Sequence, residues 1–106
     1  DAPVADPRPM EAVQAAVTRV TRRGAKLGPA DLAISVDTAL RGHTISAATV
    51  LGREDDLGSL EVGKRADFAV LAADPYEVAP ETIAEIRVAQ TWVDGVRQYV
   101  ADEVAR

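Results

Sequence analysis

The sequence contains no cysteine and only four aromatic residues, Phe68, Tyr76, Trp92 and Tyr99. The lack of cysteine excludes a disulfide framework, a thiolate metal site and a cysteine nucleophile. No apolar run approaches the ~20 residues that a membrane-spanning helix needs. Apolar residues still make up 47% of the chain, and alanine and valine supply most of them. Because such small side chains bury little area, we expect a thin core that packs on something larger.

Positive charge is also scarce. Twelve basic residues stand against seventeen acidic ones, which gives a net charge of −5. This balance disfavours a nucleic-acid binder, because binding a phosphate backbone requires a clustered positive face. The chain opens with DAPVADPRP, which has neither an initiator methionine nor the basic and then apolar pattern of a signal peptide. We expect a cytoplasmic protein in which Asp1 is a processed end or the cut edge of a longer chain.

Two helical regions are predicted in the first half of the chain. Asp6 is expected to cap the first, with Pro7 and Pro9 in its opening turn, where a missing N–H group costs little. Apolar residues at helical spacing predict one buried face through about Arg22. That face comprises Met10, Val13, Val17 and Val20.

The second helical region is predicted to begin after Ser35, a suitable N-cap residue, and to follow a loop, RRGAKLGPAD. Gly42 is expected to divide it or bend it, and Gly52 is expected to end it. Its apolar side is predicted to consist of Leu40, Ala47, Val50 and Leu51.

The second half of the chain has the pattern of strands. ADFAVLA is a short, nearly continuous apolar run, which predicts a buried strand, and PETIAE is expected to form one helical turn. IRVAQTWV and VRQYV flank Asp94-Gly95. Asp-Gly between two β-rich runs predicts a hairpin with a type I′ turn.

GSLEVGKR, residues 58–65, has the Gly-x4-Gly-Lys spacing of a nucleotide-binding P-loop. A P-loop follows a strand, opens a helix and ends in Ser or Thr. Here the segment follows a predicted helix and leads into a strand, and Arg65 takes the hydroxyl position. We therefore interpret it as a turn whose glycines let the backbone reverse, and we expect no bound nucleotide.

Several segments taken together resemble the C-terminal part of metal-dependent amidohydrolases, in the branch that contains N-acyl and formamide-type hydrolases. They are, in order, AAVTR, ALRGHTISAA, EDDLGSLEVGKRADFAVL, ADPYEV and VAQTWVDGVRQY. The resemblance implies an α+β fragment: the last helical segments of a (β/α)8 barrel, followed by the C-terminal part of a small β-sandwich. Residues 1–52 would then hold the end of the barrel with an active-site loop, and residues 53–106 the sandwich part with its hairpin.

The same resemblance implies a function for the complete enzyme. It would hydrolyse carbon–nitrogen bonds other than peptide bonds, in an amide, a cyclic amide or a formamide, with water activated by a divalent metal, most simply zinc. Asp1 would be the aspartate at the end of the last barrel strand, both a metal ligand and the catalytic base. A catalytic zinc is usually bound by about three protein ligands, so we expect this chain alone to have no activity and to bind no metal tightly.

The expected partners are a small amide-type substrate in the complete enzyme and further copies of the protein, without nucleic acid or membrane. The alternative is a non-catalytic packing or oligomerisation module with no active site of its own. The missing histidine ligands favour that alternative for the isolated chain, while Asp1 favours the hydrolase for the complete protein.

Other residues suggest sites, but each has a simpler interpretation. His43, the only histidine, lacks a partner four residues on and is interpreted as a helix-surface or packing residue rather than a metal ligand. The arginines of TRVTRR, residues 18–23, are expected to be solvated or to complement a helix dipole rather than to bind an anion. Glu54-Asp55-Asp56 lacks the alternating ligands of a calcium loop. It is read as a solvated acidic turn.

Two more predictions concern the second half. Trp92 is expected to serve the core or an interface rather than to stack on a ligand. Lys64 and Asp67 flank the entry to the predicted strand, and we expect them to pair with each other as a structural device of the turn.

Overall fold

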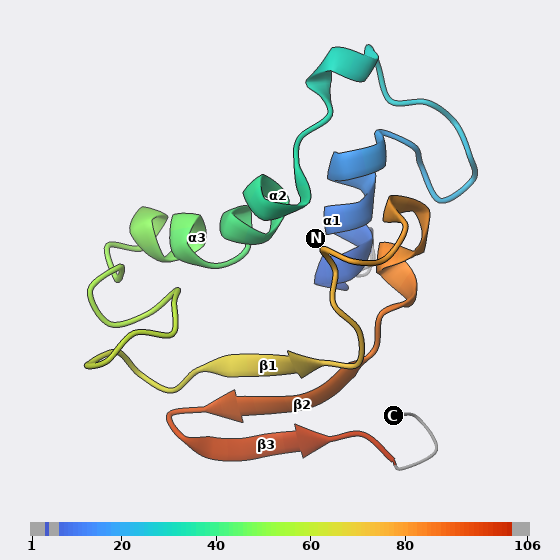
Figure 1. Ribbon diagram of the computed structural model, residues 1–106. Helices are drawn as coiled ribbons and strands as arrows, with labels where there is room; N and C mark the ends of the chain where they lie inside the picture. Colours follow the sequence, from blue (N-terminus) through green and yellow to red (C-terminus); the bar gives the residue numbers. More distant parts are fainter. Residues whose placement is uncertain (1–3, 5–6, 103–106) are drawn as a thin grey trace.

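A computed structural model describes Val4 and residues 7–102 of the chain. Figure 1 shows helical segments on one side and an antiparallel sheet on the other, which confirms the α+β class. The elements are α1 (Pro9–Thr18), η1 (Ala30–Leu32), α2 (Val36–Gly42), α3 (Ile45–Val50), β1 (Phe68–Leu71), η2 (Pro80–Glu85), β2 (Val88–Val93) and β3 (Val96–Val100), where η marks a 3₁₀ helix. In this described part no helix has the length and apolar character that crossing a bilayer requires.

Helix α1 is shorter than the sequence predicts. It begins at Pro9 with Arg8 at the N-cap, and the predicted cap Asp6 lies outside the described residues. It ends at Thr18, and the C-cap residue Arg19 has a left-handed φ of 57°. The chain then folds back, because the Leu27 amide donates to the Arg19 carbonyl over 2.6 Å. The predicted extension through Arg22 is therefore wrong.

The second helical region follows its sequence signals closely. Ser35 is the N-cap of α2, and its Oγ accepts a hydrogen bond from the Thr38 amide at 3.1 Å. Helix α2 ends at Gly42, and Thr44 at φ −126° and ψ −97° separates it from α3. Gly52, at φ +70°, follows α3 and donates to the Thr49 carbonyl. The cap, the division and the stop are all confirmed.

The predicted apolar side of this region is only partly confirmed, because Leu40 packs against the core but Ala47, Val50 and Leu51 are exposed. Val50 and Leu51 are 87% and 72% exposed, whereas Ala39 of α2 and Ala48 of α3 are buried. At Ala48 the loop after α3 approaches the helix closely, so the space there suits a small side chain. A side chain at Gly58 would meet the Ala48 Cβ at 2.7 Å.

The core is thin, as the composition predicts. Val13 of α1 and Ile83 of η2 are the largest fully buried side chains, and Ala39 completes their cluster. Helix η2 is also held to α1 by a hydrogen bond from the Ala84 amide to Oε1 of Gln14, at 2.7 Å. The PETIAE segment is thus the predicted helical turn, and it closes the core from the far end of the sequence.

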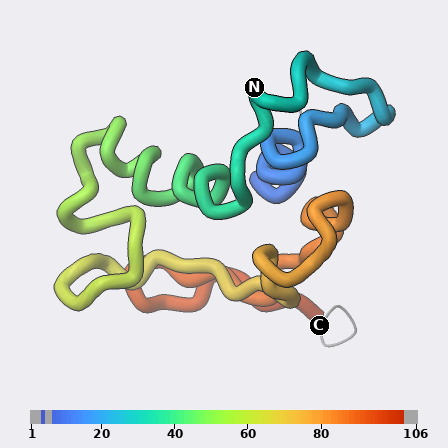
Figure 2. The backbone as a smooth tube through the Cα atoms, turned by 45° about the horizontal axis from the view of Figure 1, so that its top comes forward, coloured from blue at the N-terminus to red at the C-terminus, as the bar shows by residue number. Residues whose placement is uncertain are grey.

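The sheet has the order β1-β2-β3, with antiparallel pairing throughout. Asp94 and Gly95 have φ of 51° and 77°, which is the backbone of a type I′ turn, so the hairpin prediction is confirmed. In Figure 2 the strands run along one side of the tube and the helices lie opposite. Strand β1 was predicted to be buried, but Ala69 and Val70, whose side chains point to opposite faces of the sheet, are both exposed.

The GSLEVGKR segment lies in the loop between α3 and β1, so it leads into a strand as predicted and lacks the context of a P-loop. The predicted pair of Lys64 with Asp67 is wrong. The Lys64 ammonium lies 3.1 Å from a Glu61 carboxylate oxygen, and Asp67 accepts a hydrogen bond from the Asp94 amide at 2.7 Å. Both contacts still fix the turn, because the first closes the loop and the second ties it to the hairpin.

Candidate functional site

Asp1, the predicted catalytic base and metal ligand, lies outside the described residues. A polar groove with side chains of both charges lies between α2, the loop after α3 and Tyr76. Its volume is about 380 Å³. The lining residues are Asp37, Leu40, Arg41, Thr44, Ile45, Gly58, Ser59, Glu61 and Tyr76.

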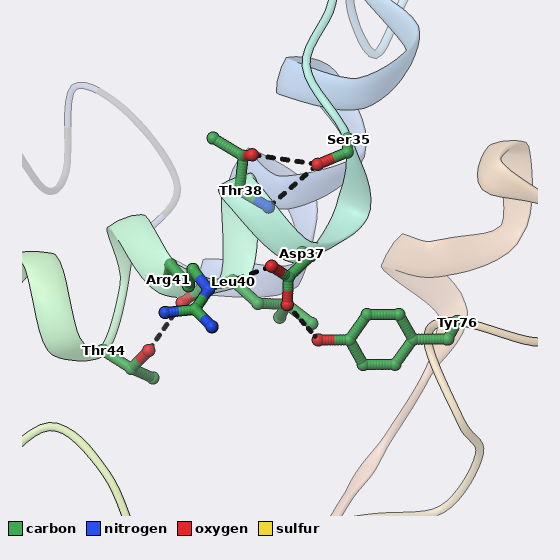
Figure 3. Close-up of polar contacts among 7 residues, drawn as sticks. All are labelled: Ser35, Asp37, Thr38, Leu40, Arg41, Thr44 and Tyr76. Atoms are coloured by element: carbon green, nitrogen blue, oxygen red, sulfur yellow. Dashed lines mark hydrogen bonds and ion pairs between the residues drawn. The ribbon is translucent and has the colours of Figure 1, made fainter.

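One wall of the groove is a hydrogen-bonded triad. Asp37 and Arg41 lie one turn apart on α2, and the Arg41 Nε contacts the Asp37 Oδ2 at 2.9 Å. The Tyr76 hydroxyl donates to the other oxygen of Asp37, also at 2.9 Å (Figure 3). Tyr76 comes from the turn before η2, where its own amide is held by Asp74. The triad thus joins α2 to a segment far along the chain.

The triad leaves Asp37 charged. Hydrogen bonds from Arg41 and then from Tyr76 lower the pKa of Asp37, while the bond to Asp37 raises the pKa of Tyr76. A carboxylate with a lowered pKa is a poor general base at neutral pH, and a phenol with a raised pKa is a poor nucleophile. The arrangement is therefore suited to holding structure rather than to proton transfer.

Ser59, which also lines the groove, lies beside Lys64, and a lysine with a serine is the pair used by some hydrolases as base and nucleophile. The Lys64 Nζ donates to the Ser59 Oγ at 2.8 Å, and Ser59 in turn donates to Glu61. The bond that Glu61 accepts from Ser59, and then its contact with Lys64, lower the pKa of Glu61. The Lys64 Nζ also lies 3.1 Å from a Glu61 carboxylate oxygen, and it donates to the Ser59 Oγ rather than accepting from it. We assign no nucleophile here.

His43 is the C-cap residue of α2, exposed to solvent, with its Nδ1 3.0 Å from the Ala39 carbonyl. Its predicted role as a helix-surface residue is confirmed, although it ends the helix rather than lying inside it. Among the described residues, no group of three or more His, Asp or Glu side chains could hold a metal ion.

The basic and acidic segments also have local roles. Arg19 donates from Nε to the Leu27 carbonyl at 2.9 Å, and Arg22 pairs with Glu11 at 2.5 Å. The last turn of α1 contains no basic residue, but Arg19 is its C-cap residue, and Arg22 and Arg23 are exposed, which agrees with the solvated role predicted as one alternative. In the acidic turn, Arg53 contacts both carboxylate oxygens of Asp56, at 3.0 and 2.5 Å.

Trp92 has the structural role that was predicted. It lies opposite Phe68 in the β1–β2 register, and the two rings stack with centroids 5.6 Å apart and an interplanar angle of 11°. Its indole N–H donates to Gln90 on the same strand. Both the ring and its polar atom are therefore engaged within the sheet.

Sequence reasoning missed the link between Asp37 and Tyr76. The contact of Asp37 with Arg41 has a readable signal, since opposite charges four residues apart face each other on a helix. The contact of Tyr76 with Asp37 has no signal in the sequence, because it depends on the path that the chain takes after β1.

The sequence matches the amidohydrolase family over residues 1–99. It is 43% identical over 99 residues to an N-substituted formamide deformylase of Arthrobacter pascens, covering 93% of this chain and 18% of that protein. It is 43% identical over 47 residues to an imidazolonepropionase of Bacteroides fragilis, covering 44% of this chain and 11% of the relative. The plant protein LONG AFTER FAR-RED 3 of Arabidopsis thaliana is 33% identical over 99 residues, covering 93% of this chain and 17% of that protein.

The crystal structure of an amidohydrolase from Thermotoga maritima is similar to this fold, with a TM-score of 0.56 and 28% sequence identity. The similarity covers 67% of this chain and 17% of that structure. The chain thus spans less than a fifth of the length of these relatives. It belongs to the amidohydrolase family.

Proposed function

We propose that these 106 residues serve as the C-terminal part of a metal-dependent hydrolase of carbon–nitrogen bonds other than peptide bonds. The observation that carries the proposal is the family match over residues 1–99. The substrate class is an amide, a cyclic amide or a formamide. A formamide as the substrate is supported by a relative named N-substituted formamide deformylase, which aligns with 93% of this chain.

In this proposal Asp1 is the catalytic base and a metal ligand, as the family resemblance implies. The described residues do not fit a metal by themselves, because no ligand cluster occurs among them. The other ligands would therefore belong to parts of the complete enzyme beyond these residues. Residues 1–52 would complete the barrel and residues 53–106 the sandwich, in a cytoplasmic homo-oligomer.

The described residues would contribute support rather than chemistry. The Asp37–Tyr76 bond fastens α2 to the turn before η2, and the Gln14–Ala84 bond fastens α1 to η2. Both contacts join residues 9–50 to residues 74–85. They would hold the segment that follows Asp1 at a constant position relative to the sheet.

A second candidate role, a packing or oligomerisation module, is favoured for the isolated chain by the lack of a metal cluster in residues 7–102. The exposed Val50, Leu51, Leu60 and Val62 agree with it, because large exposed apolar side chains are typical of contact surfaces. The two roles are compatible if the complete enzyme is the hydrolase and this part packs within it.

The test uses the longest natural polypeptide that contains this segment. Formate release from N-substituted formamides, amide hydrolysis and bound metal are measured for the wild type, Asp1→Asn and Glu54→Gln. Loss of a general base typically costs about 10²–10⁴-fold in rate, so we expect that loss for Asp1→Asn. Glu54 is an exposed carboxylate in a turn, and Glu54→Gln should keep full activity.

The result that overturns the hydrolase proposal is a folded, metal-loaded protein that hydrolyses none of these substrates. Full activity of Asp1→Asn would overturn the assignment of Asp1 alone. The 106-residue chain is assayed in parallel after dialysis, and we expect neither turnover nor one zinc per chain. Turnover or stoichiometric zinc there would contradict the module role.

A further inference from the structure

We draw no further inference here: the strongest candidate, the exposed apolar patch of Val50 and Leu51 at the C-terminal end of α3 and of Leu60 and Val62 in the loop that follows, carries nothing because nothing in the structure shows what covers it.

Discussion

The Tyr76 hydroxyl donates a hydrogen bond to the Asp37 carboxylate at 2.9 Å, although the two residues lie 39 positions apart in the sequence. Arg41 holds the second oxygen of the same carboxylate (Figure 3). One aspartate therefore joins a helix to a turn between two later elements. Its pKa is lowered first by Arg41 on the same helix and then by Tyr76, so the Tyr76 part of the shift depends on the docking of these two parts of the chain.

We expect the pKa of Asp37, measured by NMR titration, to lie below the ordinary value of about 4. Arg41→Ala should raise it more than Tyr76→Phe, because Arg41 is the larger cause of the shift. Arg53→Ala is the control: Arg53 pairs with Asp56, so the Asp37 titration should not move. Identical Asp37 titrations in the wild type and Tyr76→Phe would refute the docked geometry.

The same shift has a consequence for stability. Since the folded pKa of Asp37 is lowered, its ionised form stabilises the folded state. That contribution is complete above the unfolded value near pH 4 and is lost as the pH falls through the lower folded pKa. Urea unfolding between pH 6 and 2 should show a smaller acid loss for Asp37→Asn than for the wild type. An equal or larger loss would contradict this sign.

Gly58 and Gly63 provide a matched pair of substitutions. Both have positive φ, 95° and 97°, so alanine at either position is strained by about 1–2 kcal/mol. Only at Gly58 would the new Cβ also collide, lying 2.9 Å from the Ile45 Cα. We expect Gly58→Ala to lower the free energy of unfolding by about 1–3 kcal/mol more than Gly63→Ala does. Equal values from denaturant unfolding would show that α3 does not contact the loop.

Ile83 supports much of the small core. It is fully buried against α1, so Ile83→Ala should destabilise the chain by about 2–5 kcal/mol. The free energy of unfolding of a small domain is about 5–15 kcal/mol, so this variant should unfold at a much lower temperature than the wild type. Val62 is fully exposed, and Val62→Ala should stay within about 0.5 kcal/mol of the wild type. If the two variants unfold alike, η2 is not part of the core.

Lys64 provides a test of the nucleotide interpretation. Its side chain is 12% exposed, and its ammonium already contacts Ser59 and Glu61. Titration with Mg-ATP should therefore give no saturable change in Trp92 fluorescence, in the wild type or in Lys64→Ala. Saturable binding that is lost in Lys64→Ala would show that the loop does hold a phosphate.

Much of the local structure could be predicted from the sequence. The Ser35 cap, the break after Gly42 and the Asp94-Gly95 turn each depend on contacts within about four residues, so neighbouring residues are enough to determine them. The family was likewise readable, because the matching segments occur in the same order along the chain. The proposed site could be predicted only from that resemblance, and Asp1 lies outside the described residues.

Only the tertiary structure decided where α1 ends and which polar groups meet. Helical spacing alone would carry α1 past Arg19, but the return of the chain to Leu27 draws Arg19 into a left-handed turn. The Tyr76–Asp37 bond and the exposure of Val50 likewise depend on how distant segments pack. The physical reason is that caps and turns gain their energy from adjacent residues, whereas burial and long-range hydrogen bonds gain theirs from groups that the fold alone brings together.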